Sequence, residues 1–175
     1  MEPHFGCIIA YAGTGMARPG PVACFIHDAA AMSDLPSGIE VSTPGRGFVD
    51  ITKAVAGRVA SCGVGTGVVH LFVPHTSCSL LLGENADPVV RDDLERWFAR
   101  AVVDGDPQFR HTAEGPDDMP AHIRSILAGV SVTVPLRDGR MHLGTWQGIY
   151  LWEHRLQPHR RKVMVTVLGV PRSGT

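Results

Sequence analysis

An apolar run at residues 68–73, followed at once by a dense polar segment, is the feature that most constrains this chain's fold. The run, Val-Val-His-Leu-Phe-Val, predicts a buried strand. The polar segment ends at Asp87-Pro88, where a capping carboxylate and a proline at the first helical position predict a helix start. Because the polar segment lies between two core elements, the sequence predicts a functional site there.

Strand patterns dominate the remainder of the chain. We expect strands at 39–42, 48–51, 65–73, 77–82, 130–135, 148–152 and 162–168, with residues 77–82 pairing beside 65–73. An Asp-Gly pair at 138–139 predicts a hairpin turn. Because the strands come in groups and helices are few, the pattern favours an α+β fold with a largely antiparallel sheet.

Three helices are expected. Thr52 is predicted to cap the first, and Asp117 or Asp118 to cap the third, which ends at Gly129. The second begins after Pro88. It places Val90, Leu94, Trp97, Phe98 and Ala101 on one apolar stripe. The third helix is expected to turn its apolar residues inward: Met119, Ile123, Ile126 and Leu127.

Length and charge exclude several functional classes. The chain has 175 residues, 44% of them hydrophobic, which suits one globular domain. Sixteen basic against seventeen acidic residues leave no electrostatic footprint for nucleic acid. No apolar run approaches the roughly 20 residues that span a bilayer. Four scattered cysteines without a CxxC pair predict reduced thiols in a cytoplasmic protein.

The first 37 residues differ from the others. They are rich in Gly and Pro and show no sustained period of 2 or 3.6 residues. We expect residues 1–37 to form a poorly ordered, dispensable extension and residues 38–172 to form a single domain.

Three histidines have informative settings. His75 follows a strand end, His111 lies in a polar loop and His122 lies on a short helix. Neutral imidazoles in such settings can converge, as in three-ligand zinc sites with an open position. The alternative is that each is an ordinary surface or core histidine.

The acidic group after His75 offers related chemistry. Glu84, Asn85 and Asp87 can orient a histidine, bind a cation through water or act as a general base. Asp87 is equally suited to capping the helix that follows, and the two roles are compatible.

A second dense patch lies at residues 139–148. Arg140 can bind a phosphate, and Trp146 offers a flat face to a heterocycle. The alternative is a hairpin with a core tryptophan. Glu153 and the run at 159–162 add charge nearby, although charge runs are usually solvated.

Taken in order along the chain, these motifs resemble the YjbQ family, known as secondary thiamine-phosphate synthase enzymes. The resemblance covers about residues 39–170. The matching pieces are GRGFVDIT at 45–52, VPHTS at 73–77, ENADP at 84–88, AHI at 121–123 with Gly129, VP at 134–135, DGR at 138–140, LGTWQ at 143–147, and Glu153.

The resemblance implies an α+β domain of two packed, mainly antiparallel sheets with about three helices, assembled as a homotrimer. It implies an activity that joins a pyrimidine pyrophosphate to a thiazole phosphate, and a divalent metal, zinc or magnesium. The implied metal ligands are His75, His111 and His122, and the implied catalytic residues are Glu84, Asn85, Asp87 and Arg140. The implied substrate-binding residues are Thr76, Ser77, Gly144, Thr145, Trp146, Gln147, Glu153 and Arg160.

Two departures from the family pattern affect this assignment. An Asp-Gly-Pro-Arg-like turn is replaced by residues 154–160, where Arg160 takes the arginine's place, and Ser77 and Cys78 replace a threonine and an alanine. The residues also allow two other functions: metal-assisted hydrolysis of a phosphate ester, or a non-enzymatic trimer that binds a metal or small anion. In each case the expected partner is a small phosphorylated metabolite or ion, without nucleic acid or membrane.

Overall fold

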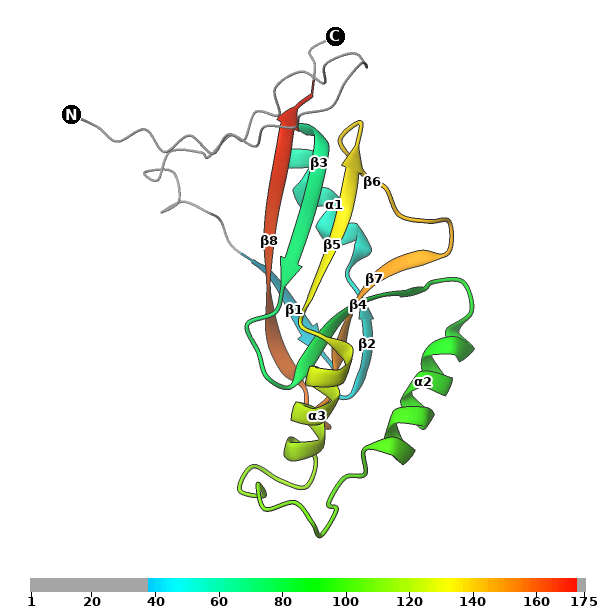
Figure 1. Ribbon diagram of the computed structural model, residues 1–175, viewed down its shortest axis with the longest axis vertical. Helices are drawn as coiled ribbons and strands as arrows, with labels where there is room; N and C mark the ends of the chain where they lie inside the picture. Colours follow the sequence, from blue (N-terminus) through cyan, green and yellow to red (C-terminus); the bar gives the residue numbers. More distant parts are fainter. Residues whose placement is uncertain (1–37, 173–175) are drawn as a thin grey trace, which may run out of the picture. The chain divides into compact units, whose positions relative to one another are not determined.

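A computed structural model describes residues 38–172, so the predicted extension at residues 1–37 lies outside the described residues (Figure 1). The elements are β1 (Ile39–Thr43), β2 (Gly47–Asp50), α1 (Thr52–Ser61), β3 (Val64–Phe72), β4 (Cys78–Glu84), α2 (Pro88–Ala101), α3 (Asp118–Ala128), β5 (Ser131–Arg137), β6 (Arg140–Met141), β7 (Gln147–Glu153) and β8 (His159–Pro171). Among these residues, no helix is both long and apolar enough to cross a membrane.

Two antiparallel sheets form the domain. The larger has the strand order β1-β8-β3-β5-β6, and the smaller has the order β2-β7-β4. In Figure 1 the larger sheet is seen from its outer side, and α3 lies below the lower end of β5, where that strand begins. The prediction of an α+β fold with two mainly antiparallel sheets and three helices is therefore confirmed for the described residues.

One apolar core joins the sheets and α1. It contains side chains from seven strands or strand ends and from α1, whose buried residues are Val55 and Val59. The buried members include Val41, Ile51, Val69, Leu71, Val73, Leu80, Val134, Leu136, Ile149, Leu151 and Val163. At about 25 cal/mol per Å² of apolar surface removed from water, burial of these side chains is the main stabilising contribution.

A buried ion pair connects the two sheets. Glu153 ends β7 in the smaller sheet, Arg161 belongs to β8 in the larger one, and the Glu153 side chain is 0% exposed. Arg161 donates from Nε to Oε2 at 2.7 Å and from Nη2 to Oε1 at 2.5 Å. Thr43 Oγ1 and the Arg155 backbone N–H donate to the same carboxylate. Burial alone would raise the pKa of Glu153, but the hydrogen bonds from Arg161, Arg155 and Thr43 hold it below its ordinary value.

The predicted helix start at Asp87-Pro88 is confirmed. Asp87 is the N-cap of α2, and its Oδ1 accepts a hydrogen bond from the Val89 backbone N–H at 2.9 Å. Thr52, however, does not cap α1. It is the first helical residue, and its Oγ1 accepts instead from the Ile149 N–H at 2.8 Å, so the hydroxyl joins α1 to β7.

The predicted partner of residues 77–82 is wrong. Strand β4 pairs with β7 in the smaller sheet, whereas β3 pairs with β5 and β8. The residues between β3 and β4 carry the chain from one sheet to the other. Alternation within a strand shows which residues share a face, but it does not show which strand lies alongside.

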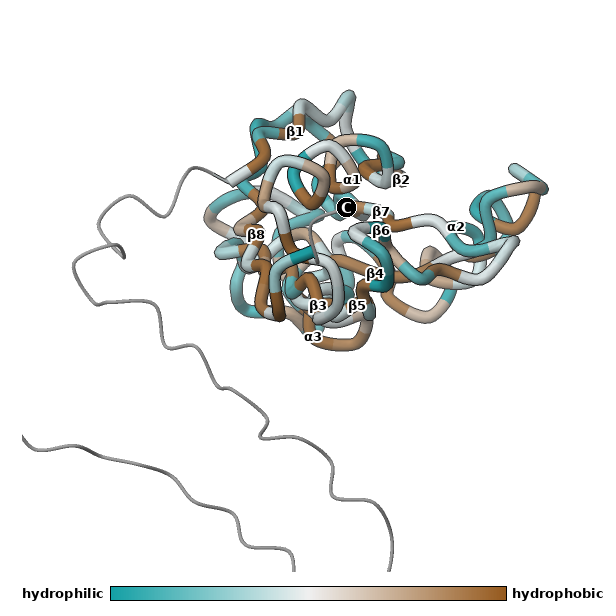
Figure 2. The backbone as a smooth tube through the Cα atoms, turned by 90° about the horizontal axis from the view of Figure 1, so that it is seen from above, coloured by the Kyte–Doolittle hydropathy of each residue, from teal (hydrophilic) through white to brown (hydrophobic). Residues whose placement is uncertain are grey.

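The apolar stripe predicted on α2 is largely exposed. No residue of α2 is buried, and Val90, Leu94 and Trp97 are exposed. Figures 1 and 2 both show α2 standing apart from the sheets. On α3, Ile126 and Leu127 are likewise exposed rather than inward.

Polar and aromatic contacts tie α2 to the domain. Glu95 accepts from the indole N–H of Trp152 and from Arg124 Nη1, which is fully buried on α3. Phe98 packs edge-on against Trp152, with ring centroids 4.8 Å apart. These contacts hold α2 through Glu95 and Phe98, whereas Val90, Leu94 and Trp97 stay exposed.

We predict that Glu153→Gln destabilises the protein by about 3–5 kcal/mol at pH 7, because Arg161 would keep a buried charge without its carboxylate. Urea unfolding measures this loss. Since the pKa of Glu153 is depressed in the folded state, the carboxylate stabilises above the ordinary value of 4.5 and loses this effect as pH falls through the folded value. The difference between wild type and variant should therefore shrink in acid.

Glu40→Gln is the control, because Glu40 is exposed on β1. The double variant Glu153→Met/Arg161→Met should lose less stability than Glu153→Gln, since it removes both charges together. A loss below about 1 kcal/mol for Glu153→Gln at pH 7 would contradict the account.

Candidate metal centre

Three side chains near the start of α3 meet at one point. His111 comes from the loop before α3, and Asp118 and His122 stand one turn apart on the helix itself. His111 Nε2 lies 2.9 Å from Asp118 Oδ2, and His122 Nε2 lies 3.3 Å from the same oxygen. One ligand atom from each residue falls within 4.8 Å of the other two. The described residues thus present a compact group of two imidazoles and one carboxylate.

The hydrogen bonding of His122 determines which of its ring nitrogens is free. His122 Nδ1 lies 2.9 Å from the backbone carbonyl of Thr76, which can only accept, so Nδ1 carries the proton. In the neutral imidazole Nε2 is then a bare acceptor, and it faces Asp118. Fixing a histidine through its other nitrogen is the usual arrangement of metal-binding imidazoles.

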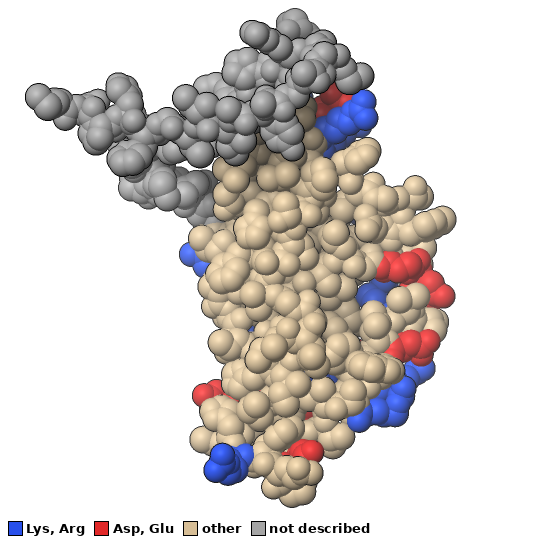
Figure 3. Space-filling model, in the orientation of Figure 1, with Lys and Arg blue, Asp and Glu red and all other residues tan. Residues whose placement is uncertain are grey.

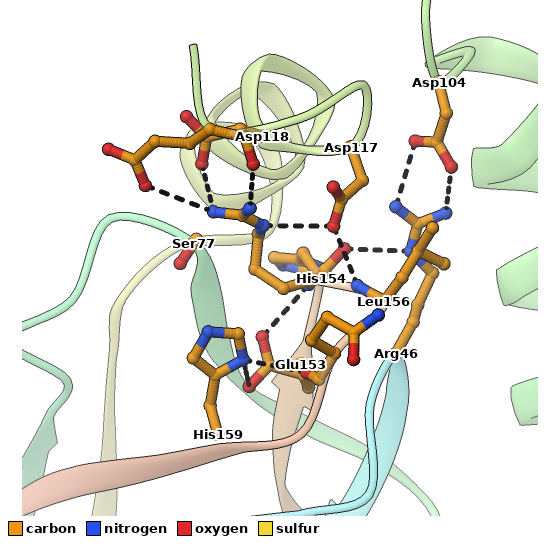
Figure 4. A network of polar contacts seen from close by, with 12 residues as sticks. Arg46, Ser77, Asp104, Asp117, Asp118, Glu153, His154, Leu156 and His159 are labelled. Atoms are coloured by element: carbon orange, nitrogen blue, oxygen red, sulfur yellow. Dashed lines mark hydrogen bonds and ion pairs between the residues drawn. The ribbon is translucent and has the colours of Figure 1, made fainter. Parts of the chain in front are cut away.

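Arg155 holds the Asp118 carboxylate in position. It donates from Nη1 to Asp118 Oδ1 at 2.5 Å and from Nε to Asp117 Oδ2 at 3.0 Å (Figure 4). Burial opposes its charge, but the hydrogen bond to Asp117 and the charges of Asp117, Asp118 and Glu114 outweigh this and raise the pKa of Arg155. The same arginine donates to the Glu114 carbonyl at 2.7 Å and so ties down the loop that carries His111.

The second oxygen of Asp118, Oδ2, faces the two imidazoles. It is buried and accepts no hydrogen bond of good geometry, although two imidazole nitrogens lie beside it. A cation between these groups, or a proton on an imidazole nitrogen, would satisfy this oxygen. Zinc–nitrogen and zinc–oxygen bonds of about 2 Å place tetrahedral ligands roughly 3.3 Å apart. The two imidazole nitrogens lie 2.9 and 3.3 Å from Asp118 Oδ2. Two imidazoles with one carboxylate suit zinc better than magnesium, which prefers oxygen ligands.

Comparisons with known proteins identify the family. The model that describes UPF0047 protein YjbQ-like sequences matches residues 37–170. The chain belongs to the YjbQ-like UPF0047 family. It is 47% identical over 132 residues to UPF0047 protein YjbQ of Salmonella typhimurium, covering 75% of this chain and 95% of that protein. It is 44% identical over 144 residues to a UPF0047 protein of Synechocystis sp., covering 82% of this chain and 98% of that protein.

A solved structure of the same fold is that of a conserved hypothetical protein from Thermus thermophilus. It shares 41% sequence identity, with a TM-score of 0.68, and the match covers 76% of this chain and 100% of that chain. The predicted resemblance to the YjbQ family is thereby confirmed.

Two of the three histidines predicted as ligands, His111 and His122, lie in the three-residue group. His75 lies outside it: its Nε2 accepts a hydrogen bond from the Lys162 backbone N–H at 3.0 Å. Thr76 contributes its carbonyl to His122. Ser77 is buried, and its hydroxyl accepts from Arg161 Nη2 at 3.0 Å.

The predicted catalytic acids lie at the far end of β4. Register pairs Glu84 with Gln147, whereas Cys78 at the other end accepts through its carbonyl from Ser125 of α3. Six residue steps of strand separate these ends by about 20 Å. Within one chain, the structure therefore does not bring Glu84 to the histidines.

Residues around Glu84 stabilise the turn into α2. The Glu84 carboxylate accepts from the backbone N–H groups of Ala86 and Asp87, and Asn85 Nδ2 donates to the Gln147 carbonyl at 3.2 Å. Trp146, 64% exposed, lies beside them because its carbonyl accepts from the Asn85 N–H. Gln147 Oε1 accepts from the Gly144 N–H, which closes the loop that contains Thr145.

The two predicted arginines lie elsewhere. Arg140 belongs to β6, at the end of β5 remote from α3 (Figure 1), and Arg160 is exposed on β8. In the loop that departs from the family pattern, Arg155 rather than Arg160 contacts the site. Glu153 is occupied by Arg161. The catalytic role of Arg140 and the substrate-binding roles of Arg160 and Glu153 stay predictions.

Sequence reasoning misses Asp118 and Arg155 as site residues. It considers Asp117 or Asp118 only as the cap of this helix; the N-cap is Asp117, which makes no side-chain capping bond. The available signal is the spacing: Asp118 and His122 are four residues apart, which places both on one helix face. No local pattern marks Arg155, since its partners are 37 and 38 residues away in sequence.

We predict that Asp118→Asn and His122→Ala each weaken zinc binding at least about 100-fold, because each removes a ligand, whereas His75→Ala changes it less than about threefold. Competition with a chromogenic chelator measures the affinities. Asp92→Asn serves as the carboxylate control, because Asp92 is exposed on α2 and lies outside the three-residue group. Loss of zinc binding on His75→Ala would restore His75 to the ligand set.

Proposed function

We propose that the protein is a metal-dependent enzyme acting on a small phosphorylated metabolite at the His111–Asp118–His122 group. The observation that carries this proposal is the buried Asp118 Oδ2, which faces His111 Nε2 at 2.9 Å and His122 Nε2 at 3.3 Å and makes no hydrogen bond of good geometry. A purely structural carboxylate would be expected to pair both oxygens, as Glu153 does.

The chain's own residues would divide the work. His111, His122 and Asp118 would hold the cation, and Arg155 and the Thr76 carbonyl would keep Asp118 and His122 in place. A divalent cation held there would stabilise negative charge on phosphate oxygens. Because His111 is half exposed, a substrate can reach the group from solvent.

Within this class, we propose the joining of a pyrimidine pyrophosphate to a thiazole phosphate as the first reaction to test. The resemblance to the YjbQ family supports this choice. In that reaction a thiazole nitrogen displaces pyrophosphate from the pyrimidine's methylene carbon, so the charge of the leaving group must be stabilised. Metal-assisted hydrolysis of a phosphate ester would use the same three residues.

We predict that zinc-loaded protein forms the coupled product and pyrophosphate, and that Asp118→Asn lowers the rate at least about 100-fold. Asp92→Asn is a matched control, because Asp92 is an exposed carboxylate on α2. Chromatography of both products measures the reaction. Release of phosphate without coupling would favour the hydrolase, and tight zinc binding without turnover of any phosphorylated metabolite would favour a binding protein. A chain that binds no metal would overturn the proposal.

We also propose a homotrimer and a cytoplasmic location. The middle of the outer face of the larger sheet shows almost no charge over β8, β3 and β5 (Figure 3). Met164, Leu168 and Val170 expose apolar side chains along β8. A sheet with both faces apolar is normally covered on both.

The cysteines support the cytoplasmic location. Cys62 and Cys78, the cysteines within the described part of the chain, are unpaired.

We predict a sedimentation mass three times the chain mass of 18.8 kDa at micromolar concentration, with Leu168→Glu lowering it. Leu156→Glu is the control, since Leu156 is 51% exposed in the loop before β8 and Leu168 is 57% exposed. A monomer mass for the wild type would contradict the trimer.

A further inference from the structure

A cavity of about 590 Å³ opens beside the end of β3 and the C-terminal half of α3. Its apolar walls include Phe72 and Pro74 on one side and Ile126 and Val130 on the other. Its volume falls in the range of small-molecule sites. His122 belongs both to this cavity and to the metal group, so the two are adjacent.

The lining determines what the cavity can accept. None of the residues around it is Lys, Arg, Asp or Glu. A phosphate or carboxylate placed inside would therefore lose its hydration without gaining a counter-charge. Ser125, also in the lining, already donates its hydroxyl to the Cys78 carbonyl. The walls thus favour an uncharged, largely apolar group.

One lining residue adds a directional polar contact. His75 Nε2 accepts from the Lys162 N–H, so in the neutral ring Nδ1 carries the proton and remains for a ligand. Burial, and then the charge of Arg161, lower the pKa of His75, which keeps the ring neutral at pH 7. His75 therefore offers the cavity an uncharged donor.

We infer that this cavity is the specificity pocket of the metal centre. It binds an uncharged, ring-sized apolar group with a hydrogen-bond acceptor, while the attached phosphate reaches His111, Asp118 and His122. This inference rests on the proposed function, because the phosphate needs the metal group. It gives His75 a role in ligand recognition and makes Phe72 and Ile126 determinants of ligand size.

The alternative ligands are small inorganic anions. Phosphate or pyrophosphate alone could occupy the metal group, but neither would use the apolar cavity beside it. The preference for an organic phosphate over a simple one therefore measures the inference directly, independently of which reaction follows.

Non-hydrolysable phosphonates test the inference by calorimetry on the zinc-loaded full chain. Phenylphosphonate should bind at least about tenfold more tightly than methylphosphonate, because its ring leaves water for the apolar walls. A para-carboxylate on the ring should remove this gain. In Ile126→Ser the preference should fall below about threefold, with the affinity for methylphosphonate and zinc unchanged.

Leu127→Ser is the matched control. Leu127 is the next residue on α3 and is 63% exposed, against 81% for Ile126, but it does not line the cavity. Its ring preference should equal that of the wild type. Equal binding of the two phosphonates by wild type, or a ring preference that survives both Ile126→Ser and Phe72→Ser, would overturn the inference.

Zinc titration without phosphonate distinguishes failure of the metal centre from failure of the specificity pocket. A chain that binds no zinc overturns the proposed function and this inference with it. A chain that binds zinc and methylphosphonate but shows no ring preference overturns the inference alone.

Discussion

The buried ion pair between Glu153 and Arg161 is the interaction on which the candidate site depends. It joins β7 of the smaller sheet to β8 of the larger one, and the loop between these strands carries Arg155. The Arg155 backbone N–H donates to Glu153, while its guanidinium holds Asp117 and Asp118. The ion pair between the sheets therefore also helps to position the Asp118 carboxylate.

Neighbouring carboxylates on α3 illustrate how local partners assign roles. Asp117 accepts from Arg155 and from the Leu156 backbone N–H; burial acts to raise its pKa, but these bonds outweigh burial and lower it. Asp118 shares only one oxygen with Arg155 and leaves the other toward His111 and His122. One carboxylate thus fixes the loop, and the next is available to a cation.

Local signals in the sequence are sufficient for the elements they govern. Asp87-Pro88 predicts the start of α2, and Asp138-Gly139 predicts the β5–β6 turn, where Asp138 and Gly139 both have positive φ. Gly129 ends α3 as expected, with φ +89°. Each of these depends on backbone conformations that particular residues favour within a few positions.

Long-range relations are not accessible in the same way. The pairing of β4 with β7 and the exposure of the α2 stripe depend on contacts between distant segments, which periodicity does not encode. At the site, residue type and resemblance indicate His111 and His122. Asp118 is missed because an aspartate at a helix start is normally interpreted as a cap. No local pattern indicates Arg155, because its partners Asp117 and Asp118 lie far away in the sequence, at the start of α3.

X-ray absorption at the zinc K-edge tests the central claim most directly, because it reports the ligands of the bound metal itself. The account predicts light-atom scatterers at about 2 Å with the outer-shell features of two imidazoles, and no sulfur at about 2.3 Å. A shell with three imidazoles would place His75 on the metal. A sulfur ligand, or a shell of oxygen atoms without imidazole, would contradict the His111–Asp118–His122 centre.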